Sequence, residues 1–171
     1  MSSPEVKGQV FSMDLLLAVV IFIIVVGILM ATWNFNKNRM DEAAWSGSLE
    51  DIAYTTSDSL VMTPGSPSNW EENTSGVVSL GLSRVERNID ERKIDSIVSI
   101  DVVVLRNLTH AGVNNISITL LDASGNVLKK AGVDPVGEYF VSSSRVVIYN
   151  GEMAVLKVMV GGDKNTAGVL T

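Results

Sequence analysis

The chain has 171 residues, of which 46% are hydrophobic and only 19% charged, a composition that argues against a disordered protein and favours one globular domain with an anchor. Its 13 Lys and Arg residues against 19 Asp and Glu give a net charge of -6, so we expect no nucleic-acid partner. The chain has no cysteine and one histidine, His110, which excludes disulfides, thiolate metal sites and multi-histidine metal sites within one copy. We therefore expect no metal and no cofactor.

The first element is an apolar run at residues 15–31, which holds no charged or strongly hydrogen-bonding side chain. With Thr32 and Trp33 it is long enough, as a helix of roughly 28 Å, to cross the hydrocarbon core of a bilayer. Trp33 and Phe35 stand where interfacial aromatic residues anchor a spanning helix. A buried helix of a soluble protein would normally show a polar face, and this run shows none. The sequence predicts a membrane-spanning helix within residues 9–35.

A secretory signal peptide that is removed after the apolar run is the main alternative. Such a peptide has a basic start, a shorter apolar stretch and a cleavage site with small residues. Here Lys7 is offset by Glu5, and the run is followed by Thr-Trp-Asn-Phe-Asn, so we expect the helix to be retained. Gly27 and Ala31 have the small-xxx-small spacing that lets membrane helices pack closely, although such residues are also common in spanning helices without a partner.

The residues before the run are Lys-Gly-Gln-Val-Phe-Ser-Met-Asp, from Lys7 to Asp14. This segment resembles the class III signal peptides of archaeal type IV pilins and pilin-like proteins. The resemblance implies that residues 1–8 are a leader, which a membrane-embedded prepilin peptidase removes between Gly8 and Gln9. It implies that residues 9–35 are the helix through which the subunits polymerise.

The position of the acidic residue departs from the family. Type IV pilins often carry glutamate at the fifth mature position, where it is thought to pair with the amino terminus of a neighbouring subunit. Here Met13 is fifth and Asp14 sixth. The resemblance assigns Asp14, with Gly27 and Ala31, to subunit assembly; the alternative is that Asp14 stays solvated at the membrane boundary.

The orientation in the membrane follows from two opposed indications. One basic residue, Lys7, precedes the run and two, Lys37 and Arg39, follow it, which slightly favours a cytoplasmic C-terminal domain. The pilin resemblance implies the reverse, and the sequons at Asn73, Asn107 and Asn115 suit an external, glycosylated domain. We expect a single-pass protein of the cell membrane with an extracellular C-terminal domain, which joins a cell-surface filament after processing.

Residues 36–95 are expected to hold a helix extension and loops. Trp45, Leu49, Ile52 and Leu60 lie near helical spacing and predict that the helix continues to about Met62. We expect kinks or breaks at residues 46–48 and 55–57, and an end set by Pro64, Gly65 and Pro67. Ser83 and Glu86 predict a capping box for a short helix that reaches Ile94. The charged residues of this segment, Asp90 and Lys93 among them, alternate in sign and predict a solvated face with local ion pairs.

Residues 63–70, here called loop 63–70, read Thr-Pro-Gly-Ser-Pro-Ser-Asn-Trp and are followed by Gly81-Leu82. This pattern is similar to a loop in uncharacterised archaeal proteins with the same kind of leader. No chemistry is assigned to it.

Residues 96–171 are expected to form an antiparallel β domain. The predicted strands are residues 97–105, 116–121, 127–129, 145–149 and 153–160. Residues 122–126 supply turn chemistry, and Asn150-Gly151 between two β runs is the strongest hairpin signal in the chain. Together with the long helix this predicts an α+β, pilin-like fold.

Few residues suit catalysis. His110 has no second histidine or cysteine to share a metal, and the serines at residues 142–144 lack a nucleophile-elbow context and suggest a turn or strand edge. Asp122, Ser124 and Asn126 resemble the start of a calcium loop, but the later ligands are missing, which favours a tight turn. We expect no enzymatic activity.

The resulting expectation is a structural subunit of an archaeal type IV pilin-like filament. Its expected partners are a prepilin peptidase, other pilin subunits, which the apolar helix contacts, and membrane lipid before assembly. The alternative is a single-pass surface protein, such as a minor pilin or adhesin, for which Trp45 and Trp70 are candidate contact residues, although packing in the core explains both.

Overall fold

A computed structural model describes residues 5–137 and 139–162, with side chains described from residue 13 onward except at residue 38. By the contacts between its residues the chain divides into two compact units, Met1–Ala44 and Trp45–Thr171. The first helix, α1 (Glu5–Met62), contributes to both units, and the second unit also contains a six-stranded sheet and two short α-helices. The predicted α+β class is confirmed.

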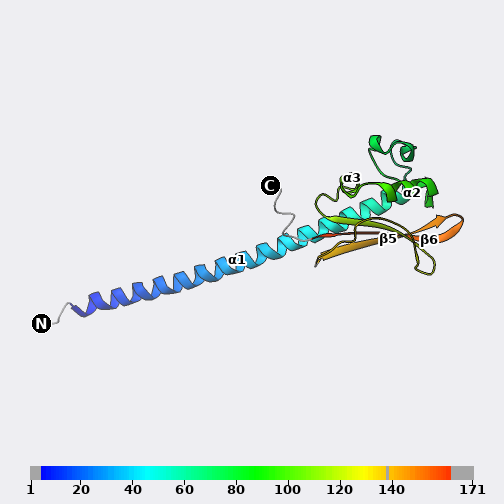
Figure 1. Ribbon diagram of the computed structural model, residues 1–171. Helices are drawn as coiled ribbons and strands as arrows, with labels where there is room; N and C mark the ends of the chain where they lie inside the picture. The colour runs from blue at the N-terminus through cyan, green and yellow to red at the C-terminus, as the bar shows by residue number, and fades with distance from the viewer. Residues whose placement is uncertain (1–4, 138, 163–171) are drawn as a thin grey trace. The chain divides into compact units, whose positions relative to one another are not determined.

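Helix α1 runs for 58 residues without interruption (Figure 1). The predicted breaks at residues 46–48 and 55–57 are therefore wrong. The weak helix formers in these stretches each cost a fraction of a kcal/mol, which burial of Leu49, Ala53 and Leu60 in the core offsets. The helix ends at Met62, before Pro64, as predicted.

The sheet is mixed, and its strand order is β1-β2-β5-β6-β3-β4. Its strands are β1 (Ser83–Val85), β2 (Asn88–Ile89), β3 (Asn115–Asp122), β4 (Val127–Gly132), β5 (Tyr139–Tyr149) and β6 (Glu152–Gly162). Every neighbouring pair is antiparallel except β2 and β5, which are parallel.

The two predicted hairpins are present. Asn150 and Gly151 join β5 to β6 with φ values of 51° and 82°, the left-handed pair that a tight hairpin turn requires. In the turn between β3 and β4, the Asp122 carboxylate accepts hydrogen bonds from the backbone N–H groups of Ser124 and Asn126, each at 2.8 Å. This Asp122 turn has the tight form that the sequence favoured over a calcium loop.

The predicted strand at residues 97–105 is wrong. This segment holds the end of helix α2 (Glu91–Ser99) and most of helix α3 (Val102–Leu108). Asp90 and Asp101 cap these helices: their carboxylates accept hydrogen bonds from the N–H groups of Arg92 at 3.0 Å and Val103 at 2.8 Å. The two aspartate caps overcome the β preference of the valines and isoleucines, and the expected start of the β domain at residue 96 falls inside α2.

The predicted capping box at Ser83 and Glu86 is also wrong. Ser83 lies in β1, and the Ser83 hydroxyl contacts the Val85 carbonyl within that strand. The helix that was expected to follow begins only at Glu91, where Asp90 supplies the cap. Between α1 and β1 lie two short 3-10 helices, η1 (Trp70–Glu72) and η2 (Thr74–Gly76).

The core lies within the second unit, between the C-terminal part of α1, the helices and one face of the sheet. Its fully buried large side chains are Trp70, Leu49, Leu60, Leu82, Ile94, Ile97, Leu105, Ile116, Ile118, Leu120, Leu156 and Val61. Alternate residues of β3 and β6 face this core, since Ile116, Ile118 and Leu120 are buried on β3 and pair with Val160, Val158 and Leu156 on β6.

Candidate functional site

The apolar part of α1 exposes its side chains on all sides within the described chain. Between Met13 and Phe35 every large apolar residue except the half-buried Val26 is exposed, from 44% at Val20 to 74% at Trp33. Among the described residues α1 is the one helix that is long and apolar enough, by length and composition, to cross a membrane. An apolar surface of this kind requires a cover, which lipid or other helices provide. The exposed apolar helix, with a sheet after it in the sequence, is consistent with a membrane anchor and with a pilin-like layout.

The residues predicted for processing and assembly all lie on α1. Lys7, Gly8 and Gln9 belong to its first turns, where only the backbone is described. Asp14, Gly27 and Ala31 are exposed, and a Cβ atom at Gly27 would meet no atom within 4 Å.

Helical geometry places Asp14 on a different face of α1 from the other two assembly positions. At 3.6 residues per turn, Gly27 and Ala31 share one face, whereas Asp14 lies about 140° around the axis from Gly27. The structure thus brings Gly27 and Ala31 together, and it places Asp14 on another face.

Loop 63–70 folds against the segment that contains Gly81, and the N–H of Ser66 donates a hydrogen bond to the Ser79 carbonyl at 3.0 Å. The indole of Trp70 is fully buried, and its Nε1–H donates a hydrogen bond to the Gly81 carbonyl oxygen at 2.8 Å. A Cβ atom on Gly81 would collide with the backbone of Thr63, Pro64 and Gly65. The two parts of the motif seen in the sequence therefore pack on each other, and Trp70 is a core residue, not a surface contact.

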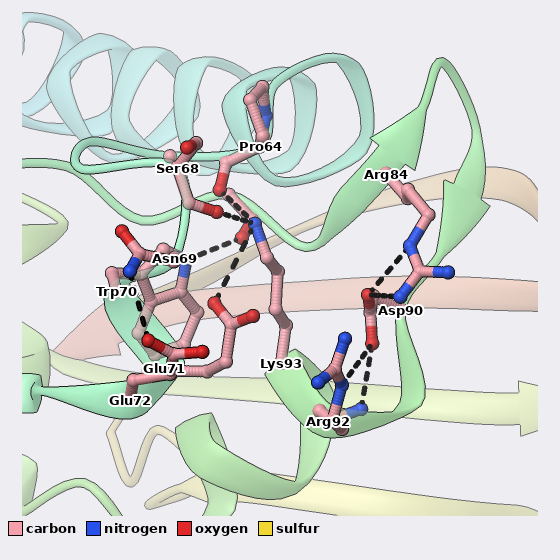
Figure 2. Close-up of polar contacts among 12 residues, drawn as sticks. Pro64, Ser68, Asn69, Trp70, Glu71, Glu72, Arg84, Asp90, Arg92 and Lys93 are labelled. Atoms are coloured by element: carbon pink, nitrogen blue, oxygen red, sulfur yellow. Dashed lines mark hydrogen bonds and ion pairs between the residues drawn. The ribbon is translucent and has the colours of Figure 1, made fainter.

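Lys93 fixes the same loop from α2. Its side chain is 4% exposed, and its Nζ donates hydrogen bonds to the carbonyl oxygens of Pro64 at 2.5 Å and Ser68 at 2.7 Å (Figure 2). The Glu71 carboxylate lies 3.9 Å from Nζ and balances the buried charge. Sequence reasoning missed this role, because it read Lys93 as part of a solvated run of alternating charges.

Asp90 was read in the same way, yet its side chain is only 7% exposed. Its carboxylate accepts hydrogen bonds from the N–H of Arg92 and from the guanidinium of Arg84, at 3.0 Å and 2.7 Å. Burial raises the pKa of Asp90, but these hydrogen bonds and the charges of Arg84 and Arg92 outweigh it and hold the pKa below its ordinary value. Asp90 is ionised at neutral pH and stabilises the start of α2.

A cleft of 330 Å³ lies between α1 and two other segments of the second unit, residues 78–80 and 108–110. Its lining is mostly apolar, with Ile52, Leu60 and Val78 among the contributors, and His110 at its rim adopts a left-handed φ of 57°. Within the described part of the chain, His, Asp and Glu form no group of three that could hold a metal ion.

The three sequons occupy different surroundings. Asn73 is exposed, and its side chain caps η2; Asn107 is exposed near the end of α3. Asn115 is half-buried at the start of β3, and its Oδ1 accepts a hydrogen bond from the guanidinium of Arg106.

The C-terminal part of α1 is attached to β5 by polar and aromatic contacts. Arg145 pairs with Asp58 at 2.9 Å, and its guanidinium lies 4.5 Å from the centre of the Tyr54 ring. The hydroxyl groups of Ser57 and Ser143 are 2.8 Å apart. Residues 142–144 thus lie within β5, so the turn alternative is wrong; they pair with β6 on one side only, which agrees with the other alternative, a strand edge.

At the other end of this contact, Trp45 packs edge-on against Tyr139 with 5.4 Å between ring centres. Trp45 is half-buried and its ring serves packing inside the second unit. Both tryptophans that the sequence offered for surface recognition therefore pack within the second unit, Trp70 fully and Trp45 in part.

Comparison with protein-family models, curated proteins and solved structures finds no match to this chain.

Proposed function

We propose that this chain is a structural subunit of a type IV pilin-like filament on the cell surface. The observation that supports it most is the continuity of α1, whose exposed apolar stretch from Met13 to Phe35 directly follows the Lys7-Gly8-Gln9 segment. In this proposal a prepilin peptidase cuts between Gly8 and Gln9. The chain has no catalytic activity of its own.

Burial of the apolar helix drives assembly in this proposal. Before cleavage, lipid covers the apolar side chains of the helix. The helix can cross the hydrocarbon because its backbone groups form hydrogen bonds with one another. After cleavage, helices of neighbouring subunits replace the lipid, and the face of Gly27 and Ala31 allows the closest approach. The unit from Trp45 onward is displayed outside the cell.

The mature N-terminus tests this proposal. We would isolate the protein from its native membrane or surface and read its N-terminus by mass spectrometry. A start at Gln9 is the expected result. A start at Met1 or Ser2 would contradict processing and favour a signal-anchored surface protein, and a start beyond Ala31 would mean secretion.

A substitution sharpens the same experiment. Gly8→Leu places a large side chain at the cleavage site and is expected to leave the chain uncut and absent from purified surface filaments. The control is Val6→Leu, a conservative change two residues earlier in the leader, which is expected to be cut normally.

A further inference from the structure

One side of strand β5 has no neighbour over most of its length. Strand β6 pairs with all of β5 from Tyr139 to Tyr149. On the other side, β2 pairs only with Ile148 and Tyr149. Within the described part of the chain, residues 139–147 therefore form an open sheet edge in the middle of the strand order.

The hydrogen-bonding groups on this edge can be assigned. The N–H of Ile148 donates to the Arg87 carbonyl at 2.7 Å, so Ile148 directs its backbone away from β6. Because the pattern repeats every two residues, Phe140, Ser142, Ser144 and Val146 direct their N–H and C=O groups to the same side. One of these carbonyls, that of Ser144, accepts a hydrogen bond from the Arg145 guanidinium at 3.2 Å.

This edge lacks the features that usually prevent strand addition. Residues 139–147 include no proline and no lysine, and their described pairing with β6 contains no bulge. The single cation, Arg145, turns toward Asp58 on α1. A long and unprotected edge is a template for another strand.

We propose that β4 of a second copy of this chain adds to the open edge of β5 as an antiparallel strand. The successive antiparallel pairs β5–β6, β6–β3 and β3–β4 make β4 run opposite to β5. A neighbour in the same orientation therefore presents β4 antiparallel to β5. Strand β4 is the other long edge of the sheet, and its six residues, Val127–Gly132, are fewer than the nine of the open stretch 139–147.

Pairing of β5 with β5 of another copy is disfavoured by orientation. Trp45 packs beside Tyr139 and Asp58 beside Arg145, so α1 and β5 run in the same direction. An antiparallel β5–β5 pair would make the chains enter the two units from opposite ends. Copies held in one membrane or filament by α1 share an orientation; to this extent the inference rests on the proposed function.

The side chains favour one register. The N–H of Val133 donates to the Ile116 carbonyl, so Lys130 and Gly132 direct their backbone groups outward from β4. The β3–β4 register shifts between Leu120 and Leu121, so this alternation does not extend to Leu128. Placing Lys130 of one copy opposite Ser142 of the next sets Gly132 opposite Phe140, and no like charges face each other. Lys129 and Lys130 are already paired with Asp95 and Asp134 in their own chain, so their charges do not block the edge.

The contact differs from a two-fold dimer, because each copy offers β5 on one side and β4 on the other. Such an interface repeats from copy to copy without closing on itself unless the rotation forms a ring. It would join the sheets of neighbouring subunits into one, in addition to the packing of the apolar helices.

Cysteine cross-linking of the full chain in its membrane tests the inference. We would introduce Ser142→Cys and Lys130→Cys together and oxidise; the chain contains no native cysteine to interfere. Directly paired residues lie about 5.5 Å apart, within disulfide range, whereas the two sites in one copy are three strands, roughly 14 Å, apart. The expected result is a ladder of cross-linked multimers.

Three controls define the outcome. Each single-cysteine variant is expected to give dimers at most, and mixing the two single variants is expected to give the mixed dimer. Lys130→Cys with Thr74→Cys, an exposed position on η2, measures random collision. A double variant that forms no more multimers than this control pair overturns the inference.

Adding Ser144→Pro to the cysteine pair provides a second measurement. Proline removes an outward N–H that bonds to no strand of its own chain among the described residues, so the thermal midpoint is expected to change little, while the ladder falls at least roughly fivefold. An unchanged ladder contradicts the inference.

The N-terminus of the same sample distinguishes the inference from the proposed function. A ladder formed by chains that start at Met1 would support edge pairing and contradict pilin processing. Chains that start at Gln9 but form no ladder would refute edge pairing and leave the processing proposal intact.

Discussion

The indole of Trp70 and the carbonyl of Gly81 are joined by a hydrogen bond of 2.8 Å in the core. This bond connects loop 63–70, which ends α1, to the segment that leads into β1. Lys93 on α2 holds the same loop from the other side through the carbonyls of Pro64 and Ser68. The motif is therefore a structural joint between α1 and the remainder of its unit.

Gly81→Ala is expected to destabilise this joint. The added Cβ would collide with backbone atoms of Thr63, Pro64 and Gly65, and backbone yields less readily than a side chain. We expect a loss of about 2 kcal/mol or more in the free energy of unfolding, measured by urea denaturation of the detergent-solubilised chain. Gly76→Ala is the control: a Cβ there meets nothing within 4 Å, so a comparable loss in both variants would contradict the collision.

Lys93→Met tests the buried ammonium. Methionine keeps most of the side-chain volume but leaves two carbonyls without their donor and the Glu71 carboxylate without the opposite charge beside it. The expected cost is about 2–3 kcal/mol in the same denaturation experiment. Lys130→Met removes an exposed lysine with a surface ion pair and is expected to cost less than about 1 kcal/mol; equal costs would show that Lys93 contributes little.

Asp90→Asn is expected to lower stability in a pH-dependent manner. Because the folded-state pKa of Asp90 lies below its ordinary value, the ionised carboxylate contributes stability above the unfolded pKa of about 3.9, and the contribution is lost as pH falls through the folded pKa. We expect a difference of about 1 kcal/mol between the wild type and Asp90→Asn at pH 7, shrinking below pH 4. Asp51→Asn, an exposed carboxylate on α1, is the control, and a pH-independent difference for Asp90→Asn would refute the explanation.

The sequons are expected to differ in glycosylation. Asn73 and Asn107 expose their side chains, whereas Asn115 is half-buried and its Oδ1 is held by Arg106. Intact-mass measurement of Asn73→Gln and Asn107→Gln should each show loss of one glycan, and Asn115→Gln should show none. Asn88→Gln, outside any sequon, is the control, and a glycan on Asn115 would contradict the prediction.

Gly27→Leu is expected to reduce filament yield while membrane insertion persists. Leucine fills the face on which Gly27 and Ala31 would admit a neighbouring helix, yet it suits lipid well. Subunits in purified filaments and in the membrane fraction would be quantified. Ala18→Leu adds similar bulk about 180° around α1 and is the matched control. Equal losses in both variants would argue against a specific packing face.

Local sequence signals were sufficient where each element depends on its own residues. The apolar run and the helical spacing from Trp45 to Leu60 predicted α1, and Pro64 predicted its end. Asn150-Gly151 predicted the β5–β6 turn because both residues accept a positive φ.

The failures arose where distant residues or single caps decide the structure. Residues 97–105 are rich in valine and isoleucine, but Asp90 and Asp101 cap two helices there. Each helix buries one face in the core, α2 through Ile97 and α3 through Leu105. Loop 63–70 depends on Lys93, which lies 29 residues after Pro64 in the sequence. The periodicity of the sequence does not predict a contact between residues so far apart.

The attachment of α1 to β5 determines how the second unit responds to tension. The contacts Trp45–Tyr139, Ser57–Ser143 and Asp58–Arg145 are spaced along a helix and a strand that run in the same direction. A pull on the N-terminal end of α1 would load these contacts together, in shear, instead of opening them one after another. A subunit held only by its helix would thus transmit the force directly to the β5–β6 hairpin.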